Sequence, residues 1–224
     1  MTTKYIGSLG NLEGEAHTRL WFGLSSHEKF SNLGKPVSFA KGEIVAQAGR
    51  HPTHCYYVLE GRMMAFEYTT TTGERYYNFN EAGSLMEANI LLERDTPVSF
   101  VAITDVKARA ISREELLGAL KEDDALALEI MTSLSYKFMA AMDQVREATQ
   151  CNVAWKVCNL LLTFAERYGV PYDGKTLIKE KISQQMMANL LGVNRITMVR
   201  AIKELREMGL IEQVNGFYCI RDKE

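Results

Sequence analysis

Basic side chains gather in one segment near the C-terminal end of the sequence. Between residues 175 and 206, seven lysines and arginines accompany two glutamates, which gives a local charge of +5 (7 − 2), whereas the whole 224-residue chain has a formal net charge of −2. This imbalance is expected when one small domain contacts phosphate groups and the rest of the chain does not. Nucleic-acid binding is therefore the first chemistry that the sequence indicates, and charge alone leaves a solvated basic face as the alternative.

The same segment has the pattern of a helix-turn-helix. Apolar residues recur at helical spacing on both sides of Gly192, a residue that tolerates the positive φ of a tight turn. The second helix is expected over about residues 194–208, with Arg195, Thr197 and Arg200 on its outer side, so it has the size and charge to enter a DNA major groove. The residues predicted to be buried are Ile182, Met186 and Leu190 in the first helix and Val199, Ile202 and Leu205 in the second.

Two short apolar runs follow this pair of helices. They lie between Leu210 and Ile220 and flank Asn215-Gly216, a strong two-residue signal for a β-hairpin. A hairpin at this place extends the helix-turn-helix to a winged helix. The alternative is an ordinary helical hairpin within a hydrophobic core.

The composition is that of an ordinary globular protein. Hydrophobic residues make up 46% and charged residues 24% of the chain, which is enough for a sizeable core and two domains. The first residues lack a secretory pattern and no apolar run approaches the ~20 residues that span a bilayer, so we expect a cytoplasmic protein without a membrane partner. The cysteines lack CxxC spacing, so we expect free thiols, no metal and no cofactor. They are Cys55, Cys151, Cys158 and Cys219.

Two periodicities divide the sequence. Between Pro36 and Ser112, short β-branched and aromatic runs separated by Gly, Pro and Thr predict an antiparallel barrel or sandwich. After Ser112, alternating steps of three and four mark one apolar seam of a long helix. The seam consists of Met131, Leu134, Phe138, Ala141, Val145 and Ala148. We expect it to pair with the same helix of a second subunit, because a winged helix that reads DNA as a dimer needs its two copies held at a fixed spacing. An intramolecular core stripe is the alternative.

A further helix is predicted from Val153 to Tyr168, with a hinge before it at Cys151-Asn152 and helix-ending residues after it at Gly169 and Pro171. Its predicted buried residues are Val157, Leu161 and Phe164. The domain organisation that we expect is a sensor barrel over residues 1–112, a dimerisation helix over residues 113–150 and a winged-helix domain over residues 151–224.

The order of these parts, together with two short stretches, resembles a known family. Residues 39–49 read FAKGEIVAQAG and residues 57–63 read YVLEGRM, with glycines where turns between strands are expected. The chain after about residue 20 thus resembles the cyclic-AMP receptor and fumarate-nitrate regulator (CRP/FNR) family of bacterial transcription factors. The resemblance implies an α+β fold with an N-terminal antiparallel β-barrel of the jelly-roll, cyclic-nucleotide-binding type, a long dimerisation helix and a C-terminal winged helix-turn-helix.

The resemblance also implies a function. We expect a homodimer that binds double-stranded DNA at a palindromic operator, responds to a small effector in the barrel and has RNA polymerase as a further partner. The residues expected to contact DNA are Ser183, Gln184, Asn194, Arg195, Ile196, Thr197, Arg200 and Lys203. Arg195 and Arg200 suit guanine edges, whereas Ile196 offers an apolar contact that suits a thymine methyl group.

The effector loop departs from the cyclic-nucleotide binders of this family. Those proteins carry an Arg-Ser pair for the phosphate where this sequence has Thr96-Pro97, and a buried phosphate without a paired cation is unfavourable. We therefore expect a largely apolar or aromatic effector, such as a weak acid that pairs with Lys137. A cyclic-nucleotide response and a protein active without any ligand are the alternatives. The residues expected around the effector are Leu85, Met86, Glu87, Ala88, Ser99, Lys137, Ala141 and Met142.

Other sensor chemistries and catalysis fit this sequence poorly. An iron–sulfur cluster needs several closely spaced N-terminal cysteines, and only Cys55 lies in the N-terminal half. The candidate haem ligands by residue type are His17, His27, His51 and His54, and we expect His51 and His54 to be solvated because they lie in a predicted loop. A metal-dependent cupin enzyme is the alternative class, but His51 and His54, taken with Glu60, have the wrong spacing, since residues three apart on a strand point to opposite faces. We expect neither an enzyme nor a metal site.

Overall fold

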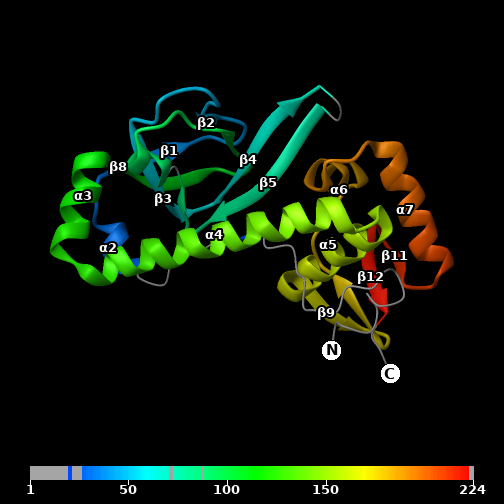
Figure 1. The fold of residues 1–224 in the computed structure, drawn as a ribbon. Helices are drawn as coiled ribbons and strands as arrows, with labels where there is room; N and C mark the ends of the chain where they lie inside the picture. Colours follow the sequence, from blue (N-terminus) through cyan, green and yellow to red (C-terminus); the bar gives the residue numbers. More distant parts are fainter. Residues whose placement is uncertain (1–19, 22–26, 71–72, 87, 222–224) are drawn as a thin grey trace. The chain divides into compact units, whose positions relative to one another are not determined.

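The structure, a computed structural model, describes residues 20–21, 27–70, 73–86 and 88–221 (Figure 1). Two of the residues singled out above, His17 and Glu87, lie outside this described part, as do the side chains of His27 and Ala88. The chain forms two compact units. The described residues of the N-terminal unit lie within 20–68 and 76–139, and those of the C-terminal unit within 69–75 and 140–221.

The N-terminal unit is built mainly from two antiparallel sheets. Its elements in chain order are α2 (His27–Ser31), β1 (Lys35–Phe39), β2 (Ile44–Ala46), β3 (His54–Glu60), β4 (Arg62–Thr69), β5 (Gly73–Glu81), β6 (Leu85–Met86), the 3-10 helix η1 (Ala88–Leu92), β7 (Ser99–Ala102), β8 (Val106–Ser112), α3 (Arg113–Glu122) and the first part of α4 (Asp124–Gln150). One sheet has the strand order β1-β8-β3-β6 and the other β2-β7-β4-β5. This arrangement confirms the predicted antiparallel domain in its sandwich form.

Strand β3 shows how the sequence positions the core of this unit. Successive side chains of a strand point to opposite faces. Cys55 and Tyr57 therefore pack in the cluster that β3 forms with helices α2, α3 and α4, whereas Tyr56 and Val58 pack between the two sheets. The ring of Tyr57 stacks on Phe30 with centroids 5.2 Å apart, and burial raises the pKa of its hydroxyl to about 12.

The change from strand to helix at Ser112 has a local cause. The Ser112 hydroxyl accepts a hydrogen bond from the amide of Glu115 (3.2 Å), and the Glu115 carboxylate accepts one from the amide of Ser112 (2.9 Å). This reciprocal capping box satisfies two amides that the first turn of a helix leaves without partners. It explains why α3 begins directly where β8 ends.

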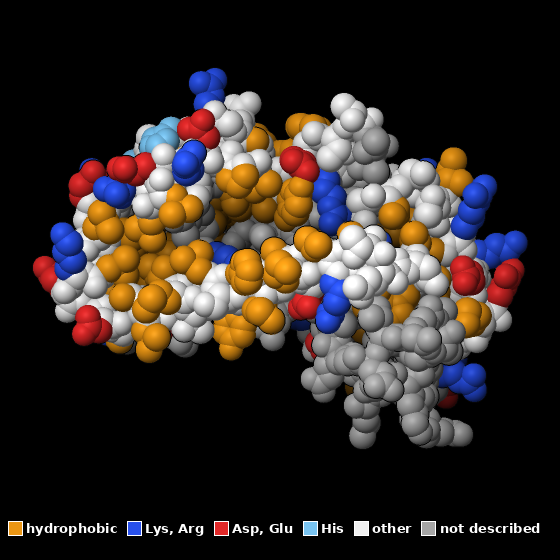
Figure 2. Space-filling view, viewed as in Figure 1, with side chains coloured by type: hydrophobic (Ala, Val, Ile, Leu, Met, Phe, Trp, Pro, Cys, Tyr) orange, Lys and Arg blue, Asp and Glu red, His pale blue; other side chains and the backbone are white. Residues whose placement is uncertain are grey.

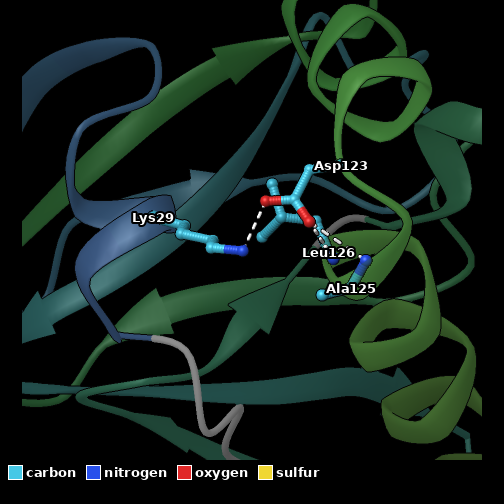
Figure 3. Close-up of polar contacts among 4 residues, drawn as sticks. All are labelled: Lys29, Asp123, Ala125 and Leu126. Carbon is cyan, nitrogen blue, oxygen red and sulfur yellow. Dashed lines mark hydrogen bonds and ion pairs between the residues drawn. The ribbon is translucent and has the colours of Figure 1, made fainter.

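Asp123 performs the same task at the start of α4 (Figure 3). Its Oδ1 atom accepts hydrogen bonds from the amides of Ala125 (3.0 Å) and Leu126 (3.4 Å). Its other oxygen accepts a hydrogen bond from the ammonium group of Lys29 on α2. The bond from Lys29 is the largest cause of a lowered pKa for this carboxyl, followed by the backbone amides. Asp123 thus connects α2, α3 and the long helix.

Two faces of helix α4 differ in their exposure to solvent. One face packs inward through Leu126, Ile130 and Ala140. The predicted seam lies on another face, and all six of its residues are exposed, among them Phe138 at 64% and Val145 at 58%. Figure 2 shows hydrophobic side chains in view along this helix. The alternative that the seam is an intramolecular core stripe is therefore wrong.

The C-terminal unit contains the predicted winged-helix elements. After the end of α4 they are α5 (Val153–Tyr168), β9 (Gly169–Tyr172), β10 (Lys175–Ile178), α6 (Gln184–Leu191), α7 (Arg195–Glu207), β11 (Ile211–Val214) and β12 (Phe217–Arg221). The predicted bounds of α5 are confirmed, and Val157, Leu161 and Phe164 are buried in it as expected. Asn152 caps this helix by accepting a hydrogen bond from the amide of Trp155 (2.8 Å). The buried amide of Asn159 donates to Glu147 (2.8 Å) and so ties α5 to the end of α4.

The sequence analysis missed one hairpin in this unit. Strands β9 and β10 pair with each other, and β10 also pairs with β12, so the sheet has four strands in the order β11-β12-β10-β9. Asp173 and Gly174 form the turn with positive φ values of 48° and 65°. This Asp-Gly pair was the available signal, but the strands are short and Pro171 lies within one of them.

Two predictions about the buried side of the two-helix motif are wrong by one position. Ile182 is buried but precedes α6, and Met187 rather than Met186 is the fully buried methionine of that helix. On α7, Met198 is fully buried, whereas Val199 is 43% exposed. The reason is geometric, because a shift of one residue turns a helical side chain by about 100°. No helix among the described residues is both long and apolar enough to cross a membrane.

Candidate nucleic-acid interface

Side-chain caps fix the start of both helices in the two-helix motif. The Ser183 hydroxyl accepts from the amide of Met186 (3.0 Å), and Asn194 Oδ1 accepts from the amide of Thr197 (2.8 Å). Between the helices Gly192 has the left-handed conformation, with φ 62° and ψ 38°, which is unfavourable for a side-chain-bearing residue. The turn that the sequence predicts is therefore present, and Ser183 and Asn194 are the N-caps of α6 and α7.

Helix α7 separates into a packing face and an outer face. Met198, Ala201, Ile202 and Leu205 are buried, and α7 contacts both α5 and α6. The residues of α7 that are exposed to solvent include Arg195, Ile196, Val199, Arg200 and Lys203. This outer face combines charged donors with two apolar side chains.

The wing lies beside the beginnings of both helices. A cleft of about 760 Å³ is bounded by the residues before and in the first turn of α6, by Arg195, and by the β11–β12 turn. Asn215 and Gly216 form that turn with φ values of 51° and 83°, as a two-residue hairpin requires. The residues that line this cleft are Lys181, Ile182, Ser183, Gln184, Gln185, Arg195, Gln213, Asn215, Gly216 and Tyr218.

The cleft brings together three of the predicted DNA-contact residues and adds others. Ser183, Gln184 and Arg195 line it, whereas Ile196, Arg200 and Lys203 lie further along α7. The sequence analysis did not select Lys181, Gln213 or Asn215, although Lys181 belongs to the basic segment. Side chains of this kind, near two helix N-termini, can donate hydrogen bonds to phosphate oxygens.

Two members of the basic segment are already paired with carboxylates. Lys175 Nζ lies 2.7 Å from Glu212 Oε1, and this hydrogen bond raises the pKa of the lysine. Lys203 Nζ lies 3.7 Å from Glu207 on the next turn of α7. Both glutamates lie after residue 206 and were not counted in the local charge of +5 for residues 175–206. The positive charge that this segment presents to a partner is therefore smaller than +5. Arg195 and Arg200 have no ion pair within the described part of the chain.

Several residues expected around an effector already pack or form hydrogen bonds within the N-terminal unit. Leu85 and Met86 are buried in different clusters of the N-terminal unit. Lys137 donates from Nζ to the carbonyl of Leu85 (2.7 Å), and Ser99 accepts from the amide of Ala48 (3.0 Å). Ala141 and Met142 are exposed on α4. Lys137 would thus have to exchange a protein partner for a ligand.

Thr96 has the position where the resemblance places a phosphate-binding arginine. Its side chain is buried, and its hydroxyl donates to the carbonyl of Val98 (3.1 Å). Its amide donates to the carbonyl of Arg50, and its own carbonyl accepts from the amide of Gly49, both at 2.9 Å. These bonds engage all three polar groups of Thr96 within the protein.

The cysteines are free thiols as predicted, but of the candidate histidines whose side chains the structure describes only His51 is exposed as expected. All four cysteines are free, and burial raises the pKa of the Cys158 thiol to about 11, so this thiol stays protonated and unreactive. His51 is exposed, with Nδ1 3.5 Å from Asp95, whereas His54 is half-buried and shares a hydrogen bond with Thr53 (3.0 Å). The described residues contain no group of three side chains arranged to hold a metal ion.

Comparisons with known proteins cover both units. Residues 36–123 match the family described as a cyclic nucleotide-binding domain, and residues 156–224 match the Crp-like helix-turn-helix domain. The chain is 20% identical over 191 residues to the CRP-like cAMP-activated global transcriptional regulator of Mycobacterium tuberculosis, which covers 85% of each chain.

Solved structures with this fold include two of the protein CprK. The structure of CprK complexed with OCPA has a TM-score of 0.75 and 18% identity, and the match covers 93% of this chain and 95% of that one. The structure of oxidized CprK in complex with o-chlorophenolacetic acid has a TM-score of 0.51 and 18% identity, with 89% and 84% covered. The match to a Crp-like helix-turn-helix domain and the similarity to a transcriptional regulator confirm the expectation of a regulator rather than an enzyme. The chain belongs to the CRP/FNR family of transcription regulators.

Proposed function

We propose that the chain is a homodimeric, sequence-specific DNA-binding protein whose N-terminal unit binds a small effector other than a cyclic nucleotide. The observation that carries DNA binding is the outer face of α7, where Arg195 lines the wing cleft and Arg200 is exposed further along the helix. Arginine bonds guanine edges bidentately, and the cleft supplies donors for phosphates. The cytoplasmic location, the domains 1–112, 113–150 and 151–224, and the interaction with RNA polymerase belong to the same proposal.

The exposed seam of α4 supports dimerisation. Six apolar residues at alternating steps of three and four lie on one face, and Met131, Phe138 and Val145 among them are more than half exposed. In a folded protein, a contiguous exposed apolar stripe of this kind usually marks an interaction surface. A second copy of α4 fits it, because a parallel pair of helices buries such a seam symmetrically. Two winged helices held in this way would read a palindrome.

Selection of binding sites from random DNA tests the DNA-binding part. We expect a palindromic consensus and an affinity whose logarithm falls linearly with the logarithm of salt concentration. The control is a scrambled duplex of the same composition. Equal affinity for the selected and scrambled duplexes, with and without cell extract as an effector source, would contradict the proposal.

Two observations support an apolar or aromatic weak acid as the effector. Thr96 offers no cation to a phosphate and has its polar groups engaged, so a buried phosphate there would remain uncompensated. Lys137 is a half-buried cation beside the buried core around Leu85 and can pair with an acid group. The name of the CprK complex supports the same class of ligand, since o-chlorophenolacetic acid is aromatic and acidic.

A response to a cyclic nucleotide is the second candidate, and the match of residues 36–123 to the cyclic nucleotide-binding domain favours it. Calorimetry with cyclic AMP, cyclic GMP and o-chlorophenolacetic acid as probes distinguishes the two. We expect no specific cyclic-nucleotide binding up to about the millimolar range, and binding of the aromatic acid that Lys137→Met weakens. Micromolar binding of a cyclic nucleotide, abolished by substitutions within residues 83–99, would favour the second candidate.

A further inference from the structure

Two apolar side chains on α7 lie outside the set of residues that are buried in its core. Ile196 is 66% exposed and Val199 is 43% exposed, whereas the core contacts of this helix come from Met198, Ile202 and Leu205. Residues three apart lie on the same side of a helix with Cβ atoms roughly 5–6 Å apart. Ile196 and Val199 therefore form a short apolar ridge, and both are β-branched, so their side chains have few rotamers to lose on binding.

The neighbours of this ridge are positively charged. Arg195 precedes Ile196 and Arg200 follows Val199, and both arginines are exposed. A surface with this charge attracts nucleic acid rather than a hydrophobic protein partner. The ridge would therefore contact DNA when α7 lies in the major groove, which is a step that rests on the DNA binding proposed above.

The major groove offers one apolar feature, the C5 methyl group of thymine. Three residues of an α-helix rise ~4.5 Å along the axis, and stacked bases are ~3.4 Å apart along a DNA strand. Two side chains with this separation can each reach a different thymine at neighbouring positions. At a guanine or cytosine they would instead leave polar base edges without partners, which is unfavourable.

We propose that Ile196 and Val199 together read two neighbouring thymine methyl groups in each half-site, between base pairs contacted by Arg195 and Arg200. Val199 is thereby a specificity-determining residue. The sequence analysis did not select it, because it predicted Val199 to be buried. The ridge selects A·T pairs through methyl contacts, while the arginines select through hydrogen bonds.

Replacement of single thymines by deoxyuridine tests this proposal, because deoxyuridine lacks only the methyl group. The probe is the duplex obtained by site selection, with the substitution in both half-sites. One buried methyl group corresponds to about fourfold in affinity per half-site, so we expect a loss of about 15-fold at each of two neighbouring positions. Val199→Ala should abolish the loss at one position and Ile196→Ala at the other, whereas the exposed Lys203→Ala should leave both losses unchanged.

Three results would overturn the proposal. One is a selected half-site without neighbouring thymines. Another is specific binding that changes less than twofold on every deoxyuridine substitution, which would leave the proposed function intact. The third is the absence of any sequence-specific binding, which would overturn the proposed function as well. Both variants alter exposed residues, and thermal unfolding of the full chain verifies that they are folded.

Discussion

Helices α4 and α7 both expose apolar side chains, but the surroundings of those side chains differ. The exposed seam of α4 continues over six residues without a charged member, from Met131 to Ala148. On α7 only Ile196 and Val199 are exposed in this way, between two arginines. A long uncharged stripe fits an identical stripe on a second subunit, whereas a two-residue ridge within a basic face fits a groove lined by phosphates. Aligned exposed apolar side chains point to a contact surface, and the charges beside them indicate the chemistry of the partner that would fit it.

The largest expected effect is on the α4 side of this comparison. Val145→Asp would place an unpaired carboxylate in the apolar seam, at a cost on the order of 3–5 kcal/mol of dimerisation free energy. Sedimentation equilibrium should show dissociation, and operator affinity should fall with it. Thr132→Asp is the matched control, because Thr132 is exposed on α4 outside the seam. An intact dimer in Val145→Asp would contradict the assignment of the α4 seam as a dimerisation surface, and with it the contrast between α4 and α7.

On α7 the buried and exposed neighbours should differ sharply in stability. Met198→Ala creates a cavity beneath the helix and should lower the free energy of unfolding by ~2–5 kcal/mol. Val199→Ala should change it by less than ~0.5 kcal/mol, because the site is exposed. Urea unfolding of both variants measures the difference. Similar losses in the two variants would mean that Val199 packs in the core after all.

A somewhat smaller effect is expected for readout by arginine. Arg200→Ala should weaken binding to the selected duplex by ~1–3 kcal/mol and relax specificity at one position. Lys203→Ala is the control with the same loss of charge, and it should act mainly on the salt dependence, reduced further because Lys203 is near Glu207. Fluorescence anisotropy with selected and scrambled duplexes separates the two effects. Equal losses on both duplexes in Arg200→Ala would reduce its role to phosphate contact.

The smallest effect concerns the start of α4. The pKa of Asp123 is lowered from 3.8, chiefly by the bond from Lys29, so its contribution to stability is present above about pH 4 and is lost as the pH falls through the lower folded-state value. Asp123→Asn should make the melting temperature less sensitive to pH between 6 and 3. Differential scanning calorimetry at both pH values measures this, and an unchanged pH dependence would count against the Lys29 contact.

Periodicity predicted the seam of α4 because the inward face of that helix is the more polar of the two. The inward face includes the buried residues Ser133 and Glu147, so the apolar pattern of the sequence marks the exposed seam more strongly than the buried face. The family resemblance likewise predicted both domains. The one-residue error between Met198 and Val199 arose because adjacent apolar residues satisfy the same helical pattern. The short β9 strand escaped detection because it contains Pro171 and only four residues.

The effector site could be predicted least. Its expected residues come from a loop and a helix that are far apart in sequence, and burial of Met86 or the bond from Lys137 to Leu85 is visible only in the folded chain. Sequence reasoning could identify the missing phosphate-binding pair at Thr96-Pro97, because that inference needs only residue types. It could not indicate that the polar groups of Thr96 are engaged in the protein.

The side-chain caps at Ser183 and Asn194 have a thermodynamic consequence. Both helices of the motif begin at caps supplied by the chain itself, so neither needs DNA to become ordered. Association would then lose little conformational entropy within the motif. The heat-capacity change of binding would correspond to the contact area alone and lack the large negative contribution that accompanies coupled folding.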